Sequence, residues 1–450
     1  MNDRVVLLSI PGLRESDLVV MPCLRGLTSA GDLAPLSASA PGVTCAVQAN
    51  MTTGELAGVH GVIGNGFYWR EEQRVEMWTA GNDKVMAPQL WDRLHEHDPT
   101  LTSAAWFPLL IKGAGADYIC TPAPIHHPDG AESLWCYTRP ERLYGELVNN
   151  LGHFPLHRFW GPLAGVEGTA WIITSAIEIA RREAPHLLYI YLPHLDYRAQ
   201  KHGPDSPEAV EACRELDAQL GRLIGSLGEL PDYRGDAALW LVASEYAITA
   251  VDRVVYPNRL LRQAGLLDVT RDADGRELID FAESRAWVLA DHQTAHAFVR
   301  DHDPAVIGRV ADVLAKAPGV AEVWDADIQQ RHGLWYEGRS ADLLAVSDAE
   351  AWFAYYWWQE DDLAPKFART VDIHRKPGYD PAEMFLDPAA HAAGIGGTPL
   401  DASRVRGSHG APVRSPSQRG VLLSSARGVL VEQPMADIDV CETVLRQFGV

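Results

Sequence analysis

The sequence lacks the features that mark several specialised classes of protein. Its 450 residues contain six cysteines, and no two of these form a C-x-x-C pair. We therefore expect reduced, mostly buried thiols rather than a disulfide framework or a zinc knuckle. No apolar run approaches the length of a membrane span, and the N-terminal residues lack the apolar stretch and cleavage site of a secretory signal. These absences predict a cytoplasmic protein without a membrane span.

Positive charge is also scarce. The chain has 39 lysines and arginines against 60 aspartates and glutamates, which gives a formal net charge of −21 at pH 7. This balance argues against a protein that binds nucleic acid polymers or anionic membranes non-specifically. The net charge does not exclude a phosphorylated small molecule as a substrate, because a bound cation can make the binding site locally positive. The chain is long enough to form a large core and two lobes.

Three continuous apolar runs predict buried strands. They cover Val5 to Ile10, His186 to Leu192 and Ala238 to Ala243, and such runs are typical of strands covered on both faces of a parallel sheet. Helical segments alternate with them, for example Thr44 to Thr53 and Pro207 to Leu227. This alternation predicts an α/β fold with short crossovers.

The residues that follow these strands predict the place of a site. Pro11 follows the first strand directly, and Asp196 and Glu245 follow the second and third within a few residues. In open α/β sheets the ligand crevice lies at the carboxyl ends of the strands. We therefore expect these segments to converge on a binding site.

The pattern changes after residue 250. Residues 251–339 show shorter strand-like and helix-like segments, which predicts a small α/β cap inserted over the crevice. Residues 341–347 (ADLLAVS) are predicted to return to the main sheet, and residues 112–135 are predicted to form a long surface loop. The core would then consist of residues 1–250 and 340–450.

Residues 40–70 carry the strongest candidate chemistry. Thr44 begins a predicted helix, whose free N–H groups and dipole favour an anion, so a phosphate could sit there and be attacked by the hydroxyl. Asn65 lies in a Gly-Asn-Gly turn, where its amide could bind an oxygen that gains charge. The alternative is an ordinary helix cap and an ordinary turn.

A set of ordered motifs carries a resemblance to a known family. They are P-x-V-T-x-x-x-Q-x-x-x-T-T-G (41–54), H-G-x-x-G-N-G (60–66), L-P-x-x-D (192–196), S-E-Y (244–246) and G-S-H-G (407–410). In this order they resemble the type I phosphodiesterase/nucleotide pyrophosphatase family of the alkaline phosphatase superfamily. The resemblance implies a three-layer sandwich with a mostly parallel central sheet and a smaller inserted α/β cap.

The resemblance also implies an activity and a set of site residues. The activity would be metal-dependent hydrolysis of a phosphodiester, pyrophosphate or phosphate monoester of a small molecule. Thr44 would be the nucleophile between two divalent ions, normally zinc, and Asn65 would stabilise the transition state. The positions implied as ligands of the first metal are Asp196, Gln200 and His409, and those implied for the second are Pro11, Thr44, Glu245 and Tyr246.

Three of the implied ligand positions hold residues that do not match the family pattern. Pro11 has no side-chain ligand, Gln200 offers a neutral amide oxygen that suits manganese or magnesium better than zinc, and Tyr246 stands where a histidine is expected. We therefore expect either that one metal ion remains or that the site is rebuilt from other residues.

Two segments are candidates for such rebuilding. Asp372 and His374 lie in a polar loop with Lys376, which could add metal ligands and a cationic phosphate clamp; the alternative is a surface turn around Pro377. The second candidate is Asp291-His292 with His296, although the alternation AHAFV favours a strand over the helix that would put both histidines on one face.

Two further expectations concern the substrate and the reaction. Tyr68 and Tyr246 are candidate substrate contacts, together with Lys376. The main hypothesis is a phosphoric ester hydrolase that works through a phospho-threonine. The alternative is a non-hydrolytic phosphoester-binding protein, or an isomerase, cyclase or transferase that uses a single metal ion. The sequence gives no indication of oligomeric state.

Overall fold

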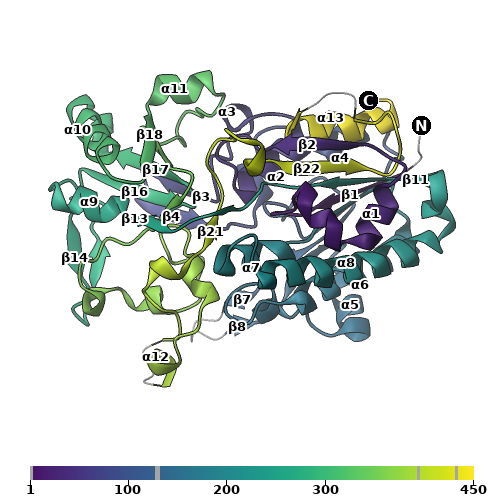
Figure 1. The fold of residues 1–450 in the computed structure, drawn as a ribbon, viewed down its shortest axis with the longest axis horizontal. Helices are drawn as coiled ribbons and strands as arrows, with labels where there is room; N and C mark the ends of the chain where they lie inside the picture. The colour runs from purple at the N-terminus through teal and green to yellow at the C-terminus, as the bar shows by residue number, and fades with distance from the viewer. Residues whose placement is uncertain (1–3, 127–131, 393–395, 431–433) are drawn as a thin grey trace.

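The protein is described by a computed structural model that covers residues 4–126, 132–392, 396–430 and 434–450. Its main lobe is built on a nine-stranded sheet, and a smaller lobe stands at one end (Figure 1). The strand order is β23-β2-β22-β11-β1-β10-β5-β6-β9. Among the described helices, none is long and apolar enough to cross a membrane.

Five neighbouring strands at the centre of this sheet run parallel to one another. They are β11 (Ala238–Ala243), β1 (Arg4–Ser9), β10 (Leu187–Tyr191), β5 (Ser103–Trp106) and β6 (Tyr118–Pro122). The outer strands are β22 (Gly420–Ser424), β2 (Leu33–Ser37), β23 (Met435–Ala436) and β9 (Cys136–Arg139). The mostly parallel sheet confirms the predicted fold class. One prediction is wrong, because β6 lies within the segment expected to be a surface loop.

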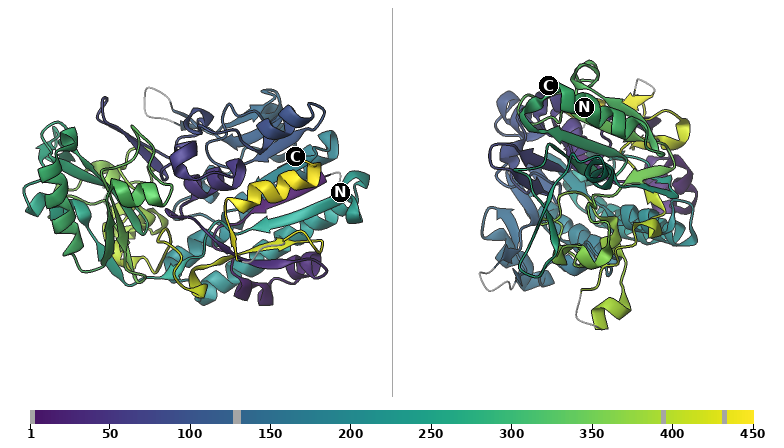
Figure 2. Two further views of the ribbon diagram at one scale, coloured as in Figure 1. Left: turned by 90° about the horizontal axis from the view of Figure 1, so that it is seen from above. Right: turned by 90° about the vertical axis from the view of Figure 1, so that its left-hand side faces the viewer.

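Helices cover both faces of the main sheet and make three layers (Figure 2). In β1, Val6 and Leu8 pack against the helices of one face, whereas Val5 and Leu7 pack against those of the other. The first face carries α1 (Pro22–Thr28), α5 (Leu143–Leu151), α6 (Val166–Glu183) and α8 (Pro207–Gly228). The second carries α2 (Thr44–Thr53), α4 (Leu90–His97) and α13 (Asp439–Leu445). A strand buried on both faces must be apolar at every position, which explains the continuous runs in the sequence.

The smaller lobe contains a four-stranded antiparallel sheet with the order β16-β17-β19-β18. Its strands are β16 (Ala286–Asp291), β17 (Thr294–Val299), β19 (Leu343–Ser347) and β18 (Val320–Trp324). Helices α9 (Pro257–Gln263), α10 (Pro304–Ala315) and α11 (Ala326–Arg331) accompany it. The expected return of residues 341–347 to the main sheet is wrong, because β19 pairs with β17 and β18. A short apolar run carries no signal for which of two sheets it joins.

The carboxyl ends of three adjacent strands meet at one place. Backbone hydrogen bonds continue past the strand ends, from Ile10 N to Ala243 O at 2.9 Å and from Leu192 N to Ser9 O at 2.9 Å. The loop after β11 is held to the segment after β1 by Gly12 N, which donates to Tyr246 O at 2.9 Å. The predicted convergence of these segments is confirmed.

Candidate functional site

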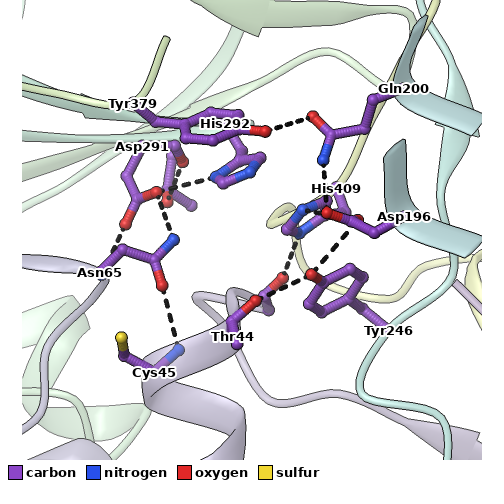
Figure 3. Close-up of polar contacts among 12 residues, drawn as sticks. Thr44, Cys45, Asn65, Asp196, Gln200, Tyr246, Asp291, His292, Tyr379 and His409 are labelled. Atoms are coloured by element: carbon purple, nitrogen blue, oxygen red, sulfur yellow. Dashed lines mark hydrogen bonds and ion pairs between the residues drawn. The ribbon is translucent and has the colours of Figure 1, made fainter. Parts of the chain in front are cut away.

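Thr44 lies at the start of α2, and its hydroxyl joins a short chain of hydrogen bonds (Figure 3). Thr44 Oγ1 is 2.9 Å from the Tyr246 hydroxyl, which donates to Asp196 Oδ1 at 3.4 Å. Because the phenolic proton is directed at the carboxylate, the Tyr246 oxygen is left to accept the Thr44 proton. The nucleophile candidate is thus connected to a carboxylate through a phenol.

The carboxylate of this chain is fixed by a second set of contacts. Asp196 lies on α7 (His194–His202), and Gln200, one turn later, donates from Nε2 to Asp196 Oδ2 at 2.9 Å. The Gln200 oxygen accepts a hydrogen bond from the Tyr379 hydroxyl at 2.9 Å. Burial raises the pKa of Asp196 to about 7, against the hydrogen bonds from Gln200 and Tyr246, which lower it.

His409 lies opposite Asp196. It follows the short strand β21 (Gly407–Ser408), which pairs with β12 (Thr249–Ala250). With Nδ1 donating to Gly42 O at 2.8 Å, Nε2 presents a lone pair 3.8 Å from Asp196 Oδ1 and has no hydrogen-bond partner among the described residues. Burial holds the pKa of His409 well below its usual value, so the ring is neutral.

Four rings form a column around His409. Tyr246 stacks on it with ring centroids 3.5 Å apart, His292 approaches it at 3.9 Å, and Tyr379 stacks on His292 at 3.6 Å. The space beside His409 is small: a cavity of about 10 Å³ is lined in part by Gly42, Tyr246 and His409. That volume accommodates about one water molecule.

Glu245 lies near this group, close enough for Asp196 and Thr44 to affect its pKa. Its Oε1 accepts hydrogen bonds from Ser9 Oγ at 2.6 Å and Gln48 Nε2 at 2.8 Å, while Oε2 is buried without a partner among the described residues. Burial raises the pKa of Glu245 to about 8. The carboxyl is therefore mostly protonated at pH 7, and it contacts the end of β1 and the middle of α2.

Asn65 is held on the other side of Thr44 by the smaller lobe. Its Nδ2 donates to Asp291 Oδ1 at 2.9 Å, its backbone N–H donates to Asp291 Oδ2 at 2.8 Å, and its Oδ1 accepts from Cys45 N at 3.0 Å. Asp291 also accepts from His292 Nδ1 at 2.8 Å. Burial pushes the pKa of Asp291 up, but the hydrogen bonds from His292 and Asn65 hold it below its usual value, so it is ionised.

Asp291 is the last residue of β16, and His292 is the first of the two residues that connect β16 to β17. The sequence pattern predicted these residues as candidate replacement metal ligands, whereas the structure shows Asp291 as the acceptor that holds Asn65. His292 has a φ of 61°, a conformation that non-glycine residues seldom adopt away from tight turns. A signal was present: two alternating strands separated by two residues predict a hairpin. Nothing in the sequence places the tip of this hairpin against Asn65.

The side chains at the site do not fit the two-metal centre that the family resemblance implies. Among the described residues, no three histidine, cysteine, aspartate or glutamate side chains are grouped to hold a metal ion. Asp196 and His409 face each other, but Gln200 directs an N–H₂ group at Asp196, and Glu245 is bound to Ser9 and Gln48. Two ligands are fewer than the three or four that a protein zinc site uses.

Other predicted site residues lie outside the contacts that surround Thr44. Lys376 is buried against two carboxylates, Asp380 at 2.8 Å and Glu383 at 2.7 Å. His374 is exposed with Nδ1 3.2 Å from Met77 O, and Asp372 is half-buried. Tyr68 packs in an aromatic cluster of the smaller lobe with Phe281, Trp287 and Phe298. The structure therefore joins Thr44, Asp196, Gln200, Tyr246 and His409 directly, with Asn65 and Glu245 beside them.

Comparisons with known proteins agree with this architecture. Residues 5–380 match the family model of the type I phosphodiesterase/nucleotide pyrophosphatase. Phosphonoacetate hydrolase from Sinorhizobium meliloti 1021, solved with phosphonoformate, is similar with a TM-score of 0.62 and 16% identity, over 98% of this chain and 95% of that one. Murine ectonucleotide pyrophosphatase/phosphodiesterase 5 has a TM-score of 0.62 and 14% identity, over 99% and 95%.

An inactive form of the murine protein in complex with AMP gives a TM-score of 0.63 at 14% identity, over 99% of this chain and 95% of that one. No curated protein matches the chain. The family and these structural neighbours are phosphoric ester hydrolases or act on related phosphorus compounds. The family match over most of the chain shows that this protein belongs to the type I phosphodiesterase/nucleotide pyrophosphatase family of the alkaline phosphatase superfamily.

Proposed function

We propose that this protein hydrolyses a phosphate ester of a small molecule, with Thr44 as the nucleophile that attacks phosphorus. Family membership supports phosphoester hydrolysis in general. The observation that carries the finer proposal is the position of the Thr44 hydroxyl, at the start of α2 and linked through Tyr246 to Asp196. One structural neighbour is solved with AMP, which is a phosphate monoester, and another with phosphonoformate, a small phosphorus anion.

The start of α2 supplies the anion-binding element. The first N–H groups of a helix have no partner within it, and the helix dipole favours negative charge there. A phosphoryl group at this end would lie next to Thr44 Oγ1. Attack forms the bond from Thr44 oxygen to phosphorus and breaks the bond from phosphorus to the leaving oxygen, and water then releases the phosphoryl group from Thr44.

Asn65 supplies a second donor for the developing charge. One of its two Nδ2 protons is directed at Asp291, which leaves the other for a phosphoryl oxygen. Both ends of the amide are fixed, by Cys45 N and by Asp291, so the orientation of the donor is set before the substrate arrives. Such preorganised donors stabilise charge in the transition state without reorganising.

Substitution of Thr44 tests this function. Thr44→Ala removes the nucleophile, and we expect it to lower kcat on bis-p-nitrophenyl phosphate by about 10³-fold or more, whereas Thr44→Ser keeps a hydroxyl and a measurable rate. The matched control is Thr28→Ala, at a threonine that bonds only the backbone of its own helix. A normal rate for Thr44→Ala would contradict the proposal.

One observation favours a second function, that of a phosphoester-binding protein that does not hydrolyse its ligand. Asp196 and His409 are two possible ligands, fewer than a zinc site uses, so the described side chains do not provide for the cation that would activate Thr44. A wild-type chain that binds p-nitrophenyl phosphate in calorimetry, without turnover of any of the tested mono- and diesters, would select this function over hydrolysis.

A further inference from the structure

We propose that the Tyr246 hydroxyl takes the place of a divalent cation between the nucleophile and Asp196, so that Thr44 is positioned and deprotonated without a metal ion. Members of the family are metal-dependent. The side chains around Thr44 in this chain do not form the ligand set that such a metal site needs. The inference that Tyr246 helps to deprotonate Thr44 rests on the proposed function. The inference that Tyr246 occupies the place of a cation does not depend on that function.

The geometry around Tyr246 carries the inference. Its oxygen lies 2.9 Å from Thr44 Oγ1 and 3.4 Å from Asp196 Oδ1. The Thr44 and Asp196 oxygens are the atoms that would hold a cation placed between them, and the Tyr246 hydroxyl is hydrogen-bonded to both. The phenol would have to leave for the ion to enter.

Tyr246 is held in this place by three further contacts. Its ring stacks on His409 with an angle of 6° between the ring planes. Its backbone oxygen accepts hydrogen bonds from Gly12 N at 2.9 Å and from Ser244 Oγ at 3.0 Å. The two hydrogen bonds fix the backbone from which the ring extends, and displacement of the ring would break its stack on His409.

The neighbouring polar groups are arranged for hydrogen bonds rather than for a cation. Gln200 points an N–H₂ group at Asp196 and gives its oxygen to Tyr379. Pro11, at the end of β1, offers no ligand atom in its side chain. His409 Nε2 lies 3.8 Å from Asp196 Oδ1 and is buried without a partner among the described residues, so His409 and Asp196 make a two-ligand set.

The same contacts provide a route for the proton. As Thr44 oxygen bonds to phosphorus, its proton passes to the Tyr246 oxygen, and the Tyr246 proton passes to Asp196 Oδ1. Tyr246 is neutral before and after the step, and Asp196 ends protonated. Tyr246 is therefore a positioning residue that acts through Thr44, in a role that a metal ion fills when it lowers the pKa of a bound hydroxyl.

Metal content tests the first part of the inference. The full chain is incubated with Zn²⁺, dialysed and analysed for metal, and we expect well below one equivalent for the wild type. Gln200→His adds an imidazole beside Asp196 and His409, and we expect it to gain about one equivalent. Gln200→Asn is the matched control and should gain none. A full equivalent in the wild type that Asp196→Asn removes would overturn the inference.

Kinetics test the second part. Tyr246→Phe keeps the ring that stacks on His409 and loses only the hydroxyl, so we expect kcat to fall by about 100-fold or more with KM little changed. EDTA should leave the wild-type rate unchanged. Loss of the wild-type rate in EDTA, or a Tyr246→Phe rate equal to the wild type, would overturn it. If the wild type shows no turnover at all, the proposed function fails, and metal content alone decides whether Tyr246 replaces the cation.

Discussion

Two carboxyl groups, Asp196 and Glu245, lie beyond the carboxyl ends of β10 and β11, the two strands that flank β1, and none of the described lysines or arginines forms an ion pair with either. Each is fixed instead by neutral donors: Gln200 and Tyr246 for Asp196, and Ser9 and Gln48 for Glu245. Because burial disfavours the charged form, both groups titrate near neutral pH. Asp196 is thus suited to take up a proton during the reaction. Glu245 makes the free energy of unfolding depend on pH.

Glu245→Gln tests this account of burial. The pKa of Glu245 is about 8 in the folded chain and about 4.3 when unfolded, so the folded state binds more protons between these values. Stability therefore falls as pH rises from about 4 to about 8. Glutamine keeps the oxygen that accepts from Ser9 and Gln48 but does not titrate. We expect the loss of unfolding free energy between pH 6 and pH 9 to be smaller in the variant by about 2 kcal/mol, measured by urea unfolding.

The control for this measurement is Glu337→Gln, at an exposed glutamate of the smaller lobe. It should leave the pH dependence as it is in the wild type. An unchanged pH dependence in Glu245→Gln would mean that this carboxyl is ionised in the folded protein throughout the range.

At the scale of secondary structure elements, the β16–β17 hairpin joins the smaller lobe to the site. Its tip makes three contacts with the site: Asp291 accepts from Asn65, the His292 ring lies against that of His409, and Gln293 N donates to His409 O at 2.9 Å. The hairpin therefore sets the position of the amide that is proposed to bind the phosphoryl group. It does so from a lobe that is distant in sequence from α2.

Asp291→Ala tests the role of this hairpin. The substitution leaves the backbone and side-chain N–H groups of Asn65 and the Nδ1–H of His292 without their acceptor in a buried place. An unsatisfied buried donor costs about 1–3 kcal/mol, so we expect a loss of about 3 kcal/mol or more in unfolding free energy. Asp312→Ala removes an exposed carboxylate of α10 and should change stability little. A denaturation midpoint for Asp291→Ala equal to that of the wild type would contradict the account.

The sequence predicted local elements well and their long-range placement poorly. The α2 prediction matches its bounds of Thr44–Thr53, because Pro41-Gly42 before it and Gly54 after it are strong local signals. The partners of Asn65 and Lys376 could not be predicted, since they depend on contacts with Asp291 and Glu383 that no local pattern encodes. Likewise, Tyr246 was identified as a departure from the family pattern, but only the structure shows its hydroxyl against Thr44 and Asp196.

At the scale of the whole molecule, the net charge of the protein and the charge of the proposed substrate are both negative. The net charge of −21 surrounds a site proposed to bind an anion. Among the described cations, Lys376 is neutralised by two carboxylates, so it does not offset this repulsion near the site. Approach of the substrate should therefore be opposed by a long-range field that salt can screen.

Salt dependence of the kinetics tests this effect. Raising the ionic strength from about 0.01 M to about 0.15 M shortens the Debye length from about 30 Å to about 8 Å. We expect kcat/KM to rise by about 2-fold or more, because screening weakens repulsion of the substrate. The rise should be larger for dianionic p-nitrophenyl phosphate than for the monoanionic diester. A fall in kcat/KM with salt would instead indicate net attraction near the site.

The central claim is that Thr44 receives the phosphoryl group in a site that needs no metal ion. The most direct measurement is mass spectrometry of the full chain, treated with EDTA, mixed with bis-p-nitrophenyl phosphate and quenched in acid. Attack expels one p-nitrophenolate, so we expect a p-nitrophenyl phosphoryl adduct on the peptide that contains Thr44, and none on the same peptide of Thr44→Ala. Turnover without any adduct at Thr44, or an adduct that forms only after zinc is added, would contradict the account.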